Sequence, residues 1–146
     1  MATWKEPVFD RTQADVDYAR SQLQKGINNA TYKGCLNTLD LSRIESNTRY
    51  LADELITLYY FTNLTTRITW ALATIPYVSQ IDRILSNVGQ LWTKYGKPSN
   101  AVALPSTLLT FKDVNDVEYN LYLLKEMLDN MVSSFRQCAT FECGEV

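Results

Sequence analysis

Apolar residues recur at three- and four-residue intervals along most of this chain, a spacing typical of amphipathic helices. It predicts four helices, over residues 12–25, from Thr38 through Leu55 toward residue 62, over 78–95, and from Thr110 to about Phe135. Residues 97–109 are predicted to form a loop, which is long for a compact domain and is therefore expected to pack across the helices. Four helices with little strand indicate an all-α bundle of about four helices.

Helix-capping residues support these limits. Thr12 with Asp15, and Thr110 with Asp113, resemble capping boxes in which Asp takes the place of the usual Glu. Gly26 follows the first predicted helix, as expected of a residue that ends a helix in a left-handed conformation.

Two stretches depart from helical spacing. Ile68 and Trp70 alternate with other residues in a run rich in β-branched side chains, which predicts a short extended segment near 66–76 with room for a strand. The last residues, 137–146, are expected to form a loose C-terminal tail. Residues 1–136 are then a single helical domain.

One pattern occurs three times: LSRIESNTRYL from residue 41, IDRILSNVGQL from 81 and VNDVEYNLYLL from 114. Asn47, Asn87 and Asn120 therefore occupy equivalent positions on three predicted helices, each on the apolar face, which indicates a repeated helix-plus-connector unit. An unpaired buried amide costs roughly 1–3 kcal/mol. We therefore expect each Asn to bind the backbone of a connector or helix end packed beside it; the alternative is that the three amides line a polar ligand site.

Charged residues also follow the repeat. Arg43 and Arg83 share one repeat position, where they either clamp an anion or play a structural role by extending to the surface or bridging a neighbouring carboxylate. Asp113, Asp116 and Glu118 lie close together in sequence, as in a metal site or a glycosidase pair. Asp113 falls where the N-terminus of a helix favours negative charge, so capping is the preferred interpretation.

The composition removes most catalytic chemistry. Histidine is absent, which excludes the commonest general base, the Ser-His and Cys-His nucleophile pairs and most zinc sites. The odd number of cysteines (Cys35, Cys138 and Cys143), without a visible secretion signal, favours reduced thiols. We predict no catalytic residue, no metal and no cofactor.

Charge and hydropathy restrict the partners. The formal net charge of −2 and a pI near 5.1 give no general attraction to nucleic acid or anionic membranes. The most apolar stretch, LITLYYFTNL, is shorter than the roughly 20 residues that span a bilayer. No nucleic-acid or membrane partner is therefore expected.

Aromatic residues are the remaining candidates for a binding surface. Exposed aromatic patches mark protein or sugar sites, and here the candidates are Tyr59, Tyr60, Trp70, Trp92 and Tyr95. The alternative is that most of these rings fill the core.

Four motifs follow one another along the chain: FDRTQADVDYA, YKGCLNTLDLSRIESNTRYLADEL, ITWALATIPYVSQIDRILSNVGQL and FKDVNDVEYNLYLLKEML. In order and spacing they resemble a family of small proteins found in phage and prophage tail-gene clusters of Gram-positive gut bacteria. The resemblance covers Trp4 to about Met131; Ser42 replaces the common Asn, and Ala73 stands where Asp is usual. It implies a structural role in the virion, at the tail tip, baseplate or fibre attachment point, and brings no catalytic residues with it.

Two hypotheses follow. The first is a non-enzymatic structural or adaptor component of a phage tail or baseplate, assembled in the host cytoplasm, that binds other tail proteins as a symmetric homo-oligomer through its exposed aromatics and loop 97–109. The second is a carbohydrate-binding module for host-surface recognition, with Tyr59, Tyr60, Trp70 or Trp92 as stacking platforms, which requires these rings to be exposed. A hydrolase is disfavoured because no pair of base and nucleophile is evident.

Overall fold

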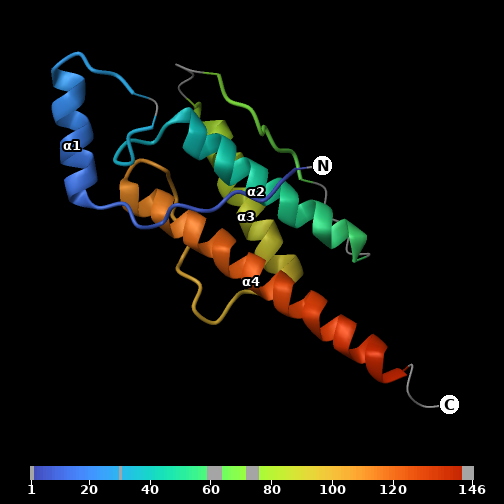
Figure 1. The fold of residues 1–146 in the computed structure, drawn as a ribbon. Helices are drawn as coiled ribbons and strands as arrows, with labels where there is room; N and C mark the ends of the chain where they lie inside the picture. Colours follow the sequence, from blue (N-terminus) through green and yellow to red (C-terminus); the bar gives the residue numbers. More distant parts are fainter. Residues whose placement is uncertain (1, 30, 59–63, 72–75, 143–146) are drawn as a thin grey trace.

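The computed structural model describes the backbone of residues 2–29, 31–58, 64–71 and 76–142, and the side chains as far as Phe135. It contains four helices: α1 (Gln13–Gln24), α2 (Thr38–Thr57), α3 (Val78–Tyr95) and α4 (Phe111–Glu142) (Figure 1). The predicted all-α bundle is confirmed. None of the described residues forms a strand. The short strand that the alternation of Ile68 and Trp70 allowed is therefore absent from the described residues.

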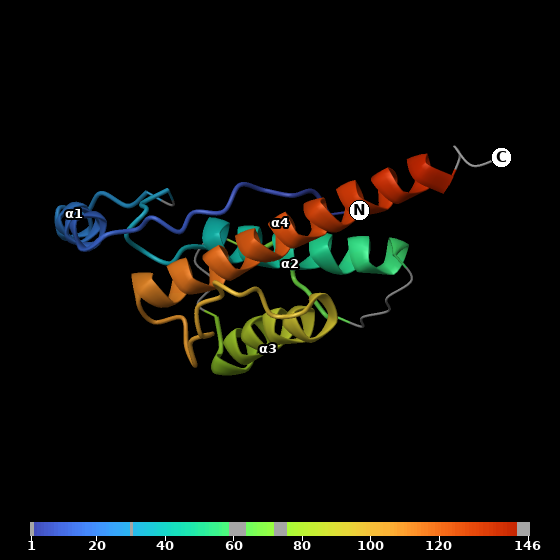
Figure 2. The same cartoon turned by 90° about the horizontal axis from the view of Figure 1, so that it is seen from below.

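Three of the helices form the core. α2, α3 and α4 pack against one another, whereas α1 makes no comparable contact with any of them. Both views show α1 standing apart at one end of the molecule (Figures 1 and 2). Leucine, isoleucine and valine side chains of the three core helices fill the interior, joined by Leu64, Trp70 and Leu108 from non-helical segments. In α1 only Ala19 is buried.

The helix ends follow the capping residues. Thr12 and Asp15 form the predicted capping box: the Thr12 N–H donates to Asp15 Oδ2 at 2.8 Å, and the Asp15 N–H donates to Thr12 Oγ1 at 3.3 Å. Thr110 and Asp113 make the same pair of bonds at the start of α4, at 2.8 and 3.2 Å. Gly26, with φ of 74°, ends α1 in the left-handed region that glycine adopts without strain.

The long helices end at positions other than those predicted. α2 ends at Thr57, and the rest of its predicted range, residues 59–62, lies outside the described residues. α4 continues to Glu142, so the fourth helix is longer than the predicted end near Phe135. That residues 137–146 form a loosely held tail stays a prediction. Residues 136–142 contain neither glycine nor proline, and nothing in them stops a helix. Figure 1 shows α4 extending well beyond the ends of α2 and α3.

Each pair of core helices is accompanied by one non-helical segment. Residues 2–11, which we call the arm, run along α2 and α4 (Figures 1 and 2). Residues 64–71 bond to side chains of α2 and α3. Residues 97–110 bond to α4 and place Leu104 close to Gly89 of α3. We refer to these three places as the α2–α4, α2–α3 and α3–α4 junctions.

Candidate functional site

Asn47 of α2 holds the arm by its main chain. The Lys5 N–H donates to Asn47 Oδ1 at 2.8 Å, and Asn47 Nδ2 donates to the Lys5 carbonyl at 2.7 Å. The Asn47 residue is 1% exposed. Because both bonds go to main-chain atoms, this contact recognises the backbone of the arm and not a side chain.

Asn120 and Asn87 bind the other two segments. Asn120, fully buried, accepts from the Val102 N–H at 3.1 Å and donates to the Val102 carbonyl at 2.9 Å. Asn87 donates to the Thr65 carbonyl at 2.8 Å. The backbone partners expected for the three amides are therefore present. Each amide holds a different segment, so the structure does not bring the three together in one ligand site.

Charged side chains surround the arm at the α2–α4 junction. Arg11 Nη2 lies 2.8 Å from Asp40 Oδ1 and 3.0 Å from Glu118 Oε1, and Arg43 Nη2 lies 2.5 and 2.6 Å from the same two oxygens. The side chains of Arg11, Asp40 and Glu118 are 2%, 7% and 1% exposed. Two guanidinium groups thus share two carboxylates in a nearly dry environment, where ion pairs are strong but costly to break. We call these four residues the ion cluster.

The ion cluster also contacts the main chain of the arm. Glu118 Oε2 accepts from the Val8 N–H at 2.5 Å and from Arg43 Nε at 2.9 Å, while Arg11 Nη1 donates to the Val8 carbonyl. Burial alone lowers the pKa of the Arg43 guanidinium. The hydrogen bond and charge of Glu118, with the charge of Asp40, outweigh burial and leave the pKa of Arg43 above its ordinary value.

Two further side chains complete the hold on the arm. Asn115 of α4 accepts from the Arg11 N–H at 3.3 Å and donates to the Arg11 carbonyl at 3.0 Å. Ser46 Oγ donates to the Thr3 carbonyl at 3.2 Å. The pattern of the sequence did not predict Asn115, Arg11 or Asp40 as site residues. Arg11 bonds to residues 29, 104 and 107 positions away. The local signals were the polar Asn115 within the third repeat and the i,i+3 pair of Asp40 and Arg43.

A smaller arrangement of the same kind occupies the α2–α3 junction. Glu45 Oε1 pairs with Arg83 Nη2 at 2.5 Å, and Glu45 Oε2 accepts from the Arg67 N–H at 2.6 Å. Burial raises the pKa of the Glu45 carboxyl, and the bonds from Arg67 and Arg83 offset this only in part. Arg83 and Arg43 thus each bridge a carboxylate of a neighbouring helix. This agrees with the predicted structural role of the two arginines and not with the alternative of an anion clamp.

The α3–α4 junction has the amide of Asn120 but no ion pair like those of Arg43 and Arg83 among its described residues. Asp116 stands at the repeat position of Arg43 and Arg83, and it makes no side-chain hydrogen bond or ion pair within the described part of the chain. Burial, and then the charge of Asp113, raise the pKa of the Asp116 carboxyl. Leu104 and Leu108 of the segment contribute to the apolar core at this junction.

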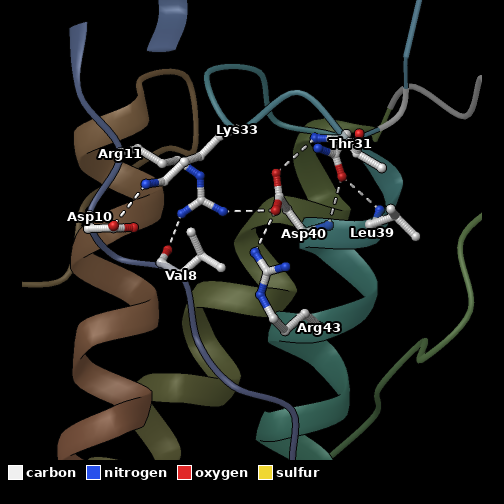
Figure 3. Close-up of a pocket in the computed structure, with 9 residues that line it drawn as sticks. Val8, Asp10, Arg11, Thr31, Lys33, Leu39, Asp40 and Arg43 are labelled. Atoms are coloured by element: carbon white, nitrogen blue, oxygen red, sulfur yellow. Dashed lines mark hydrogen bonds and ion pairs between the residues drawn. The ribbon is translucent and has the colours of Figure 1, made fainter. Parts of the chain in front are cut away.

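A pocket of about 430 Å³ opens beside the ion cluster (Figure 3). Residues of the arm, of the connector between α1 and α2, and of the first turn of α2 line it, among them Arg11, Lys33 and Arg43. Lys33 Nζ pairs with Asp10 Oδ2 at 2.8 Å. Within the described residues, Arg11 Nε has no hydrogen-bond partner. Two carboxylates, those of Asp10 and Asp40, also line the pocket. All three cations are engaged in ion pairs, since Arg11 and Arg43 pair with Asp40 and with Glu118, which does not line the pocket.

The predicted interface aromatics fall into different environments. Trp70 and Tyr95 are 5% and 8% exposed and belong to the core, where the Tyr95 hydroxyl donates to the Leu51 carbonyl at 2.8 Å. The guanidinium carbon of Arg67 lies 4.5 Å from the centre of the Trp70 ring. Because Trp70 and Tyr95 are buried, neither offers a free ring to a partner or a sugar. Trp92 is partly buried against the core. Tyr59 and Tyr60 lie outside the described residues.

The described residues contain no group of three or more His, Cys, Asp or Glu side chains placed to hold a metal ion. None of their helices combines the length and the apolar character needed to cross a membrane. Cys35 is a free thiol, while the side chains of Cys138 and Cys143 lie outside the described part. No family model, curated protein or solved structure matches this chain.

Proposed function

We propose that this protein is a non-enzymatic structural or adaptor component of a phage tail or baseplate, present in the virion in several copies and bound to other tail proteins. The sequence resemblance between Trp4 and about Met131 supports the proposal. So does the use of the buried polar groups: the amides, Glu45 and the ion cluster are all occupied in holding the chain's own segments.

The observation that carries the proposal is the exposure of apolar side chains on α1 and the turn after it. Tyr18, Leu23 and Ile27 are 60%, 45% and 51% exposed, and α1 does not pack on the core helices. We call these three residues the α1 surface. Exposed apolar groups on an otherwise well-packed small protein favour contact with another protein. Leu109, 86% exposed, adds an apolar side chain in the segment predicted as a docking loop.

We also propose that α2, α3 and α4, each with a connector, are three copies of one unit. The equivalent roles of Asn47, Asn87 and Asn120 support this, as do the ion pairs of Arg43 and Arg83 at one repeat position. We propose further that residues 66–71 form an extended segment; residues 72–75 of the predicted range 66–76 lie outside the described residues. The bonds from the Arg67 and Trp70 N–H groups to side chains of α2 support it.

The test is the native mass of the full chain, measured by light scattering alone and with each tail protein encoded beside it. We expect a defined complex with at least one of these proteins. Replacing Tyr18 and Leu23 by Ser should abolish the complex without unfolding the protein, because both side chains are exposed. The matched control replaces Tyr77 and Val78, which are 75% and 78% exposed at the start of α3, and should leave the complex intact.

Two outcomes contradict the proposal. A chain that binds none of the neighbouring proteins is not an adaptor. Binding of purified cell-wall glycan in the absence of any protein complex would instead support the carbohydrate-binding alternative.

A further inference from the structure

The core recognises the arm mainly by its backbone. Side chains of α2 and α4 bond to main-chain atoms of Lys5, Val8 and Arg11 at spacings of three residues. Only one arm side chain, that of Arg11, enters the ion cluster. The α2–α4 junction therefore accepts an extended segment that carries one correctly placed arginine.

The junction also requires this arginine. Without Arg11, the buried carboxylates of Asp40 and Glu118 would face the single guanidinium of Arg43. A buried carboxylate without a compensating cation is strongly unfavourable. The charge of the core at this place is thus complementary to the arm, and a core whose own arm has left favours the entry of another.

Most of the chain between the arm and α2 lies off the core helices. α1 makes no substantial contact with α2, α3 or α4. The connector packs on α1, where the rings of Tyr18 and Tyr32 lie 6.0 Å apart; Leu36, just before α2, packs against the core. A Cβ atom at Gly34 would lie 2.2 Å from the carbonyl carbon of Asp15, and Lys33 pairs with Asp10. The described residues of 12–35 therefore form a small body that can leave together with the arm while the packing of the three core helices is kept.

From these observations we propose that the arm is exchanged between copies of this chain: the arm of one copy occupies the α2–α4 junction of a second, and its Arg11 completes the second copy's ion cluster. Exchange of an identical element is a low-cost route to an oligomer because the closed and exchanged forms make the same contacts. The proposal rests on the proposed function, which places several copies side by side in the virion.

A photo-crosslinker at residue 9 tests the exchange. Phe9 is 36% exposed, and the centre of its ring lies 5.4 Å from those of Tyr119 and Tyr122 on α4. Full-length chains with benzoylphenylalanine at position 9, in equal amounts of normal and ¹⁵N-labelled material, are unfolded in urea and refolded together at high concentration. The oligomeric and monomeric fractions are then separated, irradiated and analysed by mass spectrometry.

We expect an oligomeric fraction in which about half of the crosslinks from residue 9 to α4 join a labelled to an unlabelled chain, as random pairing requires. In the monomeric fraction every crosslink should stay within one chain. Benzoylphenylalanine at position 77, exposed at the start of α3, is the control and should give no crosslink of mixed label to Tyr119 or Tyr122.

Either of two results overturns the exchange: no oligomer at any concentration, or an oligomer whose crosslinks never carry mixed label. Both leave the adaptor function open to its own test, because a chain with a closed arm can still bind a tail protein through the α1 surface. Conversely, mixed-label crosslinks in a chain that binds no tail protein would support the exchange and contradict the proposed function.

Discussion

The α2–α4 and α3–α4 junctions hold their non-helical segments with the same amide but with different surroundings. Asn47 binds both main-chain groups of Lys5, and Asn120 binds both main-chain groups of Val102. The four charged side chains of the ion cluster hold the same arm farther along, at Val8 and Arg11, whereas the segment bound by Asn120 relies on apolar packing of Leu104 and Leu108. The amide is therefore the constant element of the two junctions, and the charges are an addition at one of them.

The chemistry of the asparagine side chain explains why it recurs. An amide carries one acceptor and two donor hydrogens, so it can pair with the N–H and C=O groups of one residue at the same time. This pairing satisfies backbone groups that have no helix or sheet partner, whatever side chains the segment carries. The ion cluster adds a requirement that an amide cannot impose, namely an arginine at position 11.

The largest expected effect comes from removing the charge of Glu118. Glu118→Gln keeps the shape of the side chain but leaves Arg11 and Arg43 with Asp40 alone, which should lower the free energy of unfolding by about 3–5 kcal/mol, the usual cost of breaking a buried ion pair. Urea denaturation measures this change. The control is Glu126→Gln on the exposed face of the same helix, for which we expect a change within about 0.5 kcal/mol. If the two variants are equally stable, the ion cluster does not hold the arm.

The second prediction concerns the amides themselves. Asn47→Ala and Asn120→Ala should each lower the free energy of unfolding by about 2–3 kcal/mol, because each leaves main-chain groups of the bound residue without a partner. Asn130→Ala, at an exposed position of α4, is the control. Similar losses at the two junctions would support the amide as their shared element. A loss at Asn47 with none at Asn120 would show that only the charged junction is held by polar contacts.

The asparagine contacts and the ion cluster differ in how far the sequence predicted them. The helix ranges, the capping boxes and the need of each Asn for a backbone partner depend on residues close together in sequence, and all three were predicted correctly in outline. The ion cluster was not, because Arg11 pairs with residues 29 and 107 positions away. No local pattern distinguishes Arg11 from a surface arginine. The continuation of α4 was missed for a different reason: its end was predicted near Phe135, although no stop signal occurs before Gly144.

The third prediction compares the stability of α1 with that of the core helices by replacing one glycine in each region with alanine. Gly34→Ala would force its Cβ against the Asp15 backbone, so we expect α1 to loosen by about 1–3 kcal/mol, the usual cost of overpacking. The core helices should be little affected. Gly89→Ala in α3 meets only Leu104, at 3.9 Å, and should stabilise the protein by about 0.5–1 kcal/mol through helix propensity. Amide hydrogen exchange resolved by residue measures both, and an unchanged α1 in Gly34→Ala would contradict the packing of the connector on α1.

The smallest expected effect is a pH dependence confined to α1. The hydroxyl and then the main chain of Thr12 hold the pKa of the Asp15 carboxyl below its ordinary value of 3.8. A carboxyl with a lower pKa in the folded state stabilises α1 above the unfolded value, and this contribution is lost as the pH falls through the folded pKa. The protection factors of the α1 amides, which are exchange rates corrected for the intrinsic effect of pH, should therefore fall in acid. Asp15→Asn should remove this dependence while Asp17→Asn keeps it. The same acid profile in Asp15→Asn would show that the capping box is not its source.

The most direct test of the account is the exchange rate of two amide hydrogens, those of Lys5 and Val102, measured by NMR in the native protein. Neither lies in a helix, yet each donates to a buried asparagine oxygen. We predict that both are protected to nearly the same degree as the amides of the core helices. Exchange at the rate of an unstructured peptide at either position would contradict the claim that the core holds its non-helical segments through these amides.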